Sequence, residues 1–105
     1  MGFIKKVKWP SLDALVERAE RRKEMELKDT IEMMTSADYK ERFKAEYYQL
    51  KIRHDKLKAM VDKWDANKLD FKPTCSRETY GFQLYMMDGY LDVLRMRAHL
   101  EGVKL

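Results

Sequence analysis

The sequence predicts an all-α protein, built on a long antiparallel helical hairpin with an additional N-terminal helix and assembling into an oligomer. Three observations support this. The 105 residues contain only 4 Gly and 2 Pro, so little interrupts a helix. Two long segments, 38–65 and 76–101, have apolar residues spaced alternately four and three apart, which is the helical repeat. The second segment is apolar on two sides, so one hairpin partner cannot bury it.

The first expected helix runs from Ser11 to about Met34, with Ser11 as its N-cap. Its middle, Glu20 to Glu24, is charged throughout, which weakens the apolar pattern. We divide the chain into an N-terminal helical extension, residues 1–37, and a hairpin domain, residues 38–105.

The second expected helix begins after Asp38, which with Glu41 resembles a capping box, and ends near Asp65. Its apolar seam has the heptad spacing of a packed helix and consists of Phe43, Tyr47, Leu50, His54, Leu57, Val61 and Trp64. We interpret His54 as hydrogen-bonded to a neighbour, because a metal or catalytic role would need companions and the only other histidine is His99.

The opposite side of this helix carries a small apolar-aromatic patch with a basic margin. At about 100° per residue, this patch consists of Ala45, Tyr48, Ile52 and Ala59, flanked by Lys56 and Lys63.

The third expected helix is capped by Ser76 and reaches about Glu101. A connection of about ten residues joins it to the second helix, so the two should fold back on each other. Its first seam is Tyr80, Leu84, Met87, Leu91, Leu94 and Ala98. Its other side carries Phe82, Tyr85, Met86, Gly89, Val93, Met96 and Leu100. That side must be covered by the first helix, by another subunit or by both, since soluble monomers rarely expose such a patch.

Composition limits the function classes. The net charge is only +4, from 22 basic and 18 acidic residues, which suits a small anionic ligand better than a long nucleic acid. No apolar run approaches the roughly 20 residues of a membrane span, and the first ten residues contain only a fragment of a signal peptide. A single cysteine, Cys75, fits a reducing cytoplasm.

The motifs of common enzymes are missing from the sequence, which has no P-loop, dinucleotide fingerprint, zinc-ligand spacing or HExxH. A lone Cys75 at a helix start is weak evidence for a nucleophile, and we interpret it as structural or incidental. We therefore expect no enzymatic activity, no metal and no cofactor.

The basic residues allow two interpretations. They can form an ordinary solvated helix surface, or they can bind phosphates while tyrosine rings stack on bases. Under the second interpretation, groups from several chains would converge at a subunit boundary. The candidate ligand-binding residues are Tyr48, Lys56, Lys63, Arg77, Arg95 and Arg97.

Residues 38–105 resemble the hairpin domain shared by phage anti-CBASS and Thoeris anti-defence sponge proteins. The resemblance lies in ERFKAEYYQLKIRHDKLKAMVDKWD, in LDFKPTC and in YLDVLRMRAHLEGVKL. It implies a non-catalytic sponge in the cytoplasm of an infected bacterium, which sequesters cyclic oligonucleotides or cyclic ADP-ribose isomers. It also implies dimer-based assemblies, commonly hexamers, with ligands between protomers. It covers about two thirds of the chain and assigns no ligand contact to a particular residue.

Two functions of different classes follow. The first is this small-molecule sponge. The alternative is a helical structural or adaptor protein of a phage, whose basic helices bind a protein partner or nucleic acid.

Overall fold

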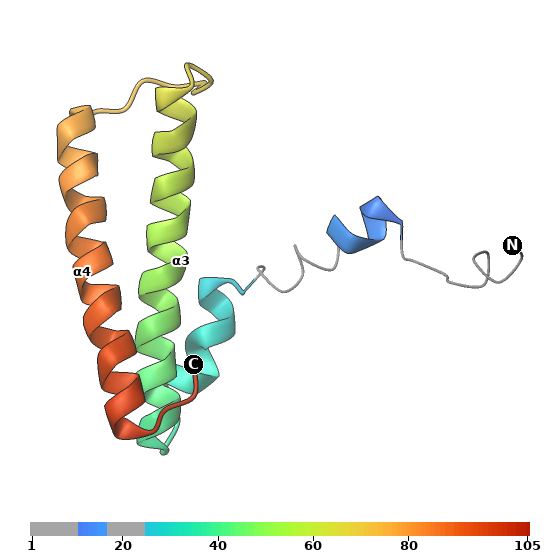
Figure 1. Cartoon of the computed structure of the whole chain (residues 1–105), viewed down its shortest axis with the longest axis vertical. Helices are drawn as coiled ribbons and strands as arrows, with labels where there is room; N and C mark the ends of the chain where they lie inside the picture. Colours follow the sequence, from blue (N-terminus) through green and yellow to red (C-terminus); the bar gives the residue numbers. More distant parts are fainter. Residues whose placement is uncertain (1–10, 17–24) are drawn as a thin grey trace, which may run out of the picture.

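The computed structural model describes residues 11–16 and 25–105, and every regular element in these residues is helical (Figure 1). In chain order the elements are η2 (Leu27–Thr30), α2 (Ile31–Met34), α3 (Tyr39–Asp65) and α4 (Arg77–Glu101). Residues 12–16 form a further helical segment. Helices α3 and α4 pack against each other along the hairpin. The predicted all-helical class and the predicted hairpin are confirmed.

The two long helices begin at the predicted N-caps. The Asp38 carboxylate accepts a hydrogen bond from the backbone N–H of Lys40 at 3.0 Å, and the Ser76 hydroxyl accepts one from the N–H of Thr79 at 3.2 Å. Each bond satisfies one of the donors that a helix start leaves without an intrahelical partner. The reciprocal bond of the predicted capping box, from the backbone N–H of Asp38 to the Glu41 carboxylate, is not formed. The Glu41 carboxylate accepts a hydrogen bond from the Lys44 ammonium instead.

Helix α4 ends because Gly102 adopts a left-handed conformation, with a φ of 70°. The backbone N–H of Val103 then donates to the carbonyl of Ala98 at 2.8 Å, the six-to-one bond of a Schellman motif. This turn places the Val103 side chain in the core. Asn67, with a φ of 57°, ends α3 by the same conformation.

The hydrophobic core lies between α3 and α4, in the half of the hairpin that contains the start of α3 and the end of α4. Its buried members are Phe43, Tyr47, Leu91, Leu94, Ala98 and Val103. Five of these belong to the two predicted seams, and Leu94 is fully buried. The seams therefore pack as the spacing predicts.

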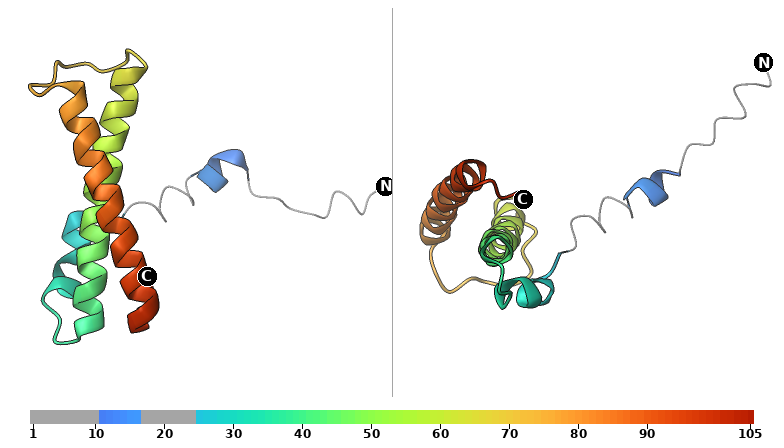
Figure 2. Two further views of the ribbon diagram at one scale, coloured as in Figure 1. Left: turned by 60° about the vertical axis from the view of Figure 1, so that its left-hand side comes forward. Right: turned by 90° about the horizontal axis from the view of Figure 1, so that it is seen from below.

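Residues 27–34 cover part of the side of α3 that faces away from α4. Elements η2 and α2 contact α3, and the views of Figures 1 and 2 place them beside the first half of that helix. Thr30 and, on α3, Ala45 and Ile52 are buried. Part of the patch predicted from sequence is therefore covered within the chain.

The prediction of one continuous helix from Ser11 to Met34 is wrong. Ser11 does cap a helical turn, because its hydroxyl accepts from the N–H of Ala14 at 3.1 Å. Residues 25 and 26, however, are not helical, and η2 follows them as a 3-10 turn. The side chain of Asp29 accepts from the N–H of Glu26 at 2.9 Å, which starts a new helix at this point. Residues 17–24 of the predicted helix lie outside the described residues.

The side of α4 that faces away from α3 is exposed in this chain. Phe82 is 65% exposed, Met86 57% and Leu100 75%. Neither η2 nor α2 covers this side of α4, because both pack against α3. In the described part of the chain, no helix is both long and apolar enough to cross a bilayer.

Candidate functional site

Three of the predicted ligand residues lie on α3, in different surroundings. Tyr48 is half-buried against the core, with its ring edge-on to that of Tyr47 at a centroid distance of 5.2 Å. The Lys56 ammonium lies 3.1 Å from the Glu26 carboxylate, so it ties α3 to residues 26–34, which we call the N-terminal segment. Lys63 is exposed. Tyr48 therefore contributes to packing, which the helical spacing did not suggest.

Arg77 closes the loop end of the hairpin. Its guanidinium donates two hydrogen bonds to the Asp65 carboxylate, at 2.9 and 3.0 Å. This bidentate pairing raises the pKa of Arg77 and lowers the pKa of Asp65. Arg77 thus already has an anionic partner within its own chain.

Arg95 and Arg97 lie near the opposite end and contact aromatic rings of α3. The guanidinium carbon of Arg95 lies 5.7 Å from the ring centroid of Tyr47, and that of Arg97 lies 4.9 Å from the ring centroid of Phe43. These are cation–π distances. A hydrogen bond to the Tyr47 hydroxyl raises the pKa of Arg95. Both arginines thus help to hold α4 on α3.

Arg97 also belongs to a three-residue polar contact at this end. It donates to the Glu101 carboxylate at 3.0 Å and to the Tyr39 hydroxyl at 2.9 Å, while the Tyr39 hydroxyl donates to Glu101 at 2.6 Å. The hydrogen bond from Tyr39, and then that from Arg97, lower the pKa of Glu101. The carboxylate therefore stays charged and fixes both neighbours.

The six predicted residues do not form one site within a chain. Fifteen residues separate Tyr48 from Lys63, which is about 22 Å along an α-helix, and twenty separate Arg77 from Arg97, which is about 30 Å. They could converge only if groups from different chains meet at a subunit boundary.

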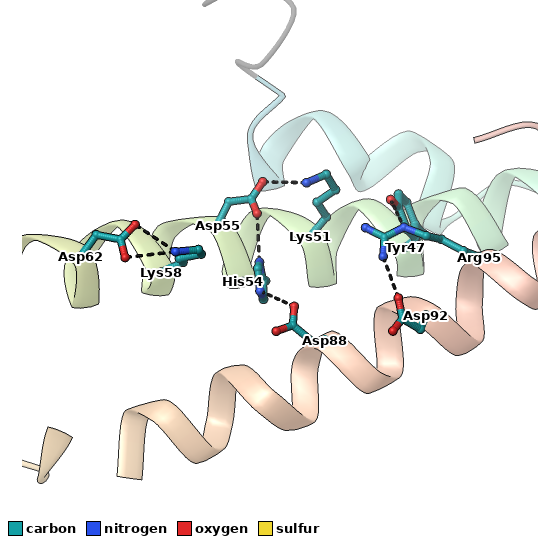
Figure 3. Close-up of polar contacts among 9 residues, drawn as sticks. All are labelled: Tyr47, Lys51, His54, Asp55, Lys58, Asp62, Asp88, Asp92 and Arg95. Carbon is teal, nitrogen blue, oxygen red and sulfur yellow. Dashed lines mark hydrogen bonds and ion pairs between the residues drawn. The ribbon is translucent and has the colours of Figure 1, made fainter. Parts of the chain in front are cut away.

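One flank of α3 carries a row of paired charges (Figure 3). We call it the paired flank and define it by Lys51, Asp55, Lys58 and Asp62. Lys51 contacts Asp55 at 3.0 Å, and Lys58 contacts Asp62 at 3.0 Å. Each positive charge here has a carboxylate one turn away, so this flank has little charge left for an anionic ligand.

His54 connects the paired flank to α4. Its Nδ1 lies 2.9 Å from Asp55, and its Nε2 lies 2.7 Å from Asp88 of α4, as Figure 3 shows. Burial alone would raise the pKa of Asp55, but hydrogen bonds from His54 and Lys51 outweigh it and lower that pKa. The predicted role of His54 as a hydrogen-bonded seam residue is confirmed.

The other flank of α3 contains a cavity of about 290 Å³ between α2 and α4. We call it the Arg53 pocket and define it by six of its lining residues, which are Met34, Arg42, Glu46, Gln49, Arg53 and Tyr90. The four that come from α3 recur every three or four residues, which places them in one line on the helix.

None of the six predicted ligand residues lines this pocket. Arg53 belongs to the basic residues of the second predicted helix and Tyr90 is one of six tyrosines, but their common position was not predictable. It depends on α2, whose placement on α3 the apolar spacing did not give. One sequence signal could have pointed to the site. The line of residues from Arg42 to Arg53 on one side of α3 has an arginine at each end.

Comparison with known proteins identifies a matching family. A family model described as Sequestin matches residues 37–100, a range that contains all of α3 and nearly all of α4. No curated protein and no solved structure matches the chain.

Proposed function

Because the chain belongs to the Sequestin family of phage anti-defence sponge proteins, we propose that it sequesters cyclic oligonucleotide or cyclic ADP-ribose-type immune signals. Sequestering immune signals is what the family suggests, and the ligand class is our inference. By holding the signal intact, the protein would inhibit anti-phage defence of the CBASS or Thoeris kind in the cytoplasm of an infected bacterium.

The observation that carries this proposal is the extent of the family match. The matched residues, 37–100, span both helices of the hairpin rather than one helix. The similarity to the family therefore covers the helix pair as a whole. The side chains of Arg95 and Arg97 are 48% and 43% exposed, and exposed guanidinium groups suit phosphates.

We further propose that the working form is a homo-oligomer, dimer-based and hexameric, with ligands bound between protomers. The exposed side of α4 supports this, because soluble monomers rarely expose a continuous apolar stripe. Gly89 lies in the middle of that stripe, and a Cβ added there would meet nothing within 4 Å. A second helix could therefore approach closely at this point. The ligand contacts proposed for such a boundary are Tyr48, Lys56, Lys63, Arg77, Arg95 and Arg97.

A ligand titration tests the proposed function. The full chain is melted with cyclic di- and trinucleotides and with cyclic ADP-ribose isomers, each added separately. A ligand present at a hundred times its dissociation constant should stabilise the protein by about 2.7 kcal/mol, and chromatography should recover it unchanged. If no compound raises the melting temperature, the sponge proposal fails and the adaptor function replaces it. If the ligand is recovered cleaved, the protein is an enzyme and not a sponge.

A further inference from the structure

The Arg53 pocket differs from the paired flank in how its positive charges are satisfied. Among the described residues, no carboxylate lies within ion-pair distance of Arg42 or Arg53. The Arg42 guanidinium donates to the backbone carbonyl of Ser36 at 2.8 Å. Two guanidinium groups therefore face a pocket that contains one carboxylate, Glu46, and this leaves a net positive charge.

Glu46 already has a partner within the pocket. The Tyr90 hydroxyl of α4 donates a hydrogen bond to its carboxylate, and this bond raises the pKa of Tyr90. The pairing links α3 to α4 and reduces the repulsion that a bare carboxylate would exert on an anion. Carboxylate oxygens remain available to accept hydrogen bonds from hydroxyl or amino groups.

Gln49 presents an acceptor with a fixed orientation. The Thr30 hydroxyl donates its one hydrogen to the carbonyl of Leu27 at 2.7 Å, so it can only accept from Gln49. The Gln49 amide nitrogen therefore points toward Thr30, at 2.9 Å, and the amide oxygen points away from it. A buried threonine of η2 thus sets the hydrogen-bonding character of this side chain.

The dimensions suit part of a nucleotide ligand. A cavity of about 290 Å³ is near the lower limit of roughly 300–1,000 Å³ for small-molecule sites. It is large enough for one nucleotide unit but too small to enclose a cyclic oligonucleotide. Tyr90 also borders a groove on the exposed side of α4, beside Met86 and Gly89. The rest of a larger ligand would therefore lie next to the surface proposed to bind a second chain.

We propose that the Arg53 pocket binds one phosphate-bearing nucleotide unit of the sequestered signal. Arg53 contacts the phosphate, with Arg42 at the other end of the pocket, and Glu46 and Gln49 accept hydrogen bonds from the base or ribose. This assignment rests on the proposed function. It places a ligand site within one protomer, in addition to contacts made between protomers.

Calorimetry with a matched pair of variants tests the assignment. Arg53→Gln removes a positive charge from the pocket, and Lys58→Gln removes one from the paired flank of the same helix. Both positions are exposed, so both variants should fold, as circular dichroism can verify. Each is titrated with the cyclic di- and trinucleotides and cyclic ADP-ribose isomers used for the parent. Arg53→Gln should weaken binding at least tenfold and make it less dependent on salt, whereas Lys58→Gln should bind within twofold of the parent.

The possible outcomes separate the pocket from the function. If the parent binds and Arg53→Gln binds equally well, the pocket assignment is wrong and the proposed function stands. If both variants lose the same affinity, a general charge effect replaces a local contact, which also overturns the assignment. If the parent binds none of the compounds, the proposed function and the pocket assignment both fail.

Discussion

Helices α3 and α4 have similar lengths, 27 and 25 residues, and both have apolar residues on two sides, but among the described residues only α3 has part of its outer side covered. We use outer side for the side of each helix that faces away from the other. On α3, Ala45 is 1% exposed and Ile52 9%, because η2 and α2 pack there. On α4, the corresponding side has Val93 52% exposed and Met96 62%.

The two outer sides also differ in the size of their side chains. Ala45 is small and allows a short helical segment to approach the backbone of α3 closely. The outer side of α4 carries Phe82, Tyr85 and Met86, which bury much more area when they are covered. Among the described residues, η2 and α2 therefore cover part of α3, while the outer side of α4 stays exposed, and we propose that a second copy of this chain covers it.

The largest effect on stability is expected at the covered outer side. Ala45→Asp would place a carboxylate between α3 and the N-terminal segment without a partner, and should lower the free energy of unfolding by about 3 kcal/mol. Ala59→Asp is the matched control, because Ala59 was predicted on the same side but is exposed. It should change stability by about 0.5 kcal/mol or less. Urea denaturation measures both, and equal losses would show that the N-terminal segment does not bury this side in solution.

The same substitution on α4 should affect assembly instead. Met86→Asp introduces a charge that an oligomer interface would have to bury without a partner, so the assembly should dissociate while helix content is kept. Light scattering measures the mass, and circular dichroism measures the helix content. Gln83→Asp adds a charge to an exposed position of α4 outside the apolar stripe and should leave the mass unchanged. A parent that is already a monomer at micromolar concentration would contradict the proposed interface.

The sequence predicted the hairpin accurately because its signals are local. Asp38 and Ser76 cap the helices they were expected to cap, and Gly102 ends α4 because no other residue adopts its left-handed conformation so readily. Apolar spacing then identified which residues of α3 face α4. Caps and spacing depend on neighbours within a few residues, which a single sequence contains.

The candidate site was less predictable because it depends on contacts between distant segments. Helical spacing showed that α3 has a second apolar side, but not that η2 and α2 would cover it. It also could not show which basic residues are already paired: Lys56 with Glu26 and Arg77 with Asp65 are separated by many positions in the chain. The pocket beside Arg53 forms only once α2 lies on α3.

Tyr48 provides a test of whether the aromatic patch predicted on α3 also contacts the ligand. If its ring stacks on a base, Tyr48→Ala should weaken ligand binding at least tenfold, about 1.4 kcal/mol. Because Tyr48 also packs against the core, the variant should lose some stability as well. Tyr48→Phe keeps the ring and should retain both properties. If calorimetry shows that Tyr48→Ala binds like the parent while Arg53→Gln does not, the ligand occupies the pocket and Tyr48 has only a structural role.

The smallest effect is expected at Lys56, where a structural and a ligand role can be separated. Its ion pair with Glu26 joins two side chains that are 64% and 49% exposed, so Lys56→Gln should lower the free energy of unfolding by about 0.5 kcal/mol or less. Glu26→Gln breaks the same ion pair but keeps the lysine charge. If Lys56 contacts a phosphate, calorimetry should show weaker binding for Lys56→Gln and no loss for Glu26→Gln. If neither variant loses affinity, Lys56 only helps to hold the N-terminal segment on α3. A loss of several kcal/mol in either variant would instead mean that this ion pair, and not apolar burial around Ala45, holds the segment in place.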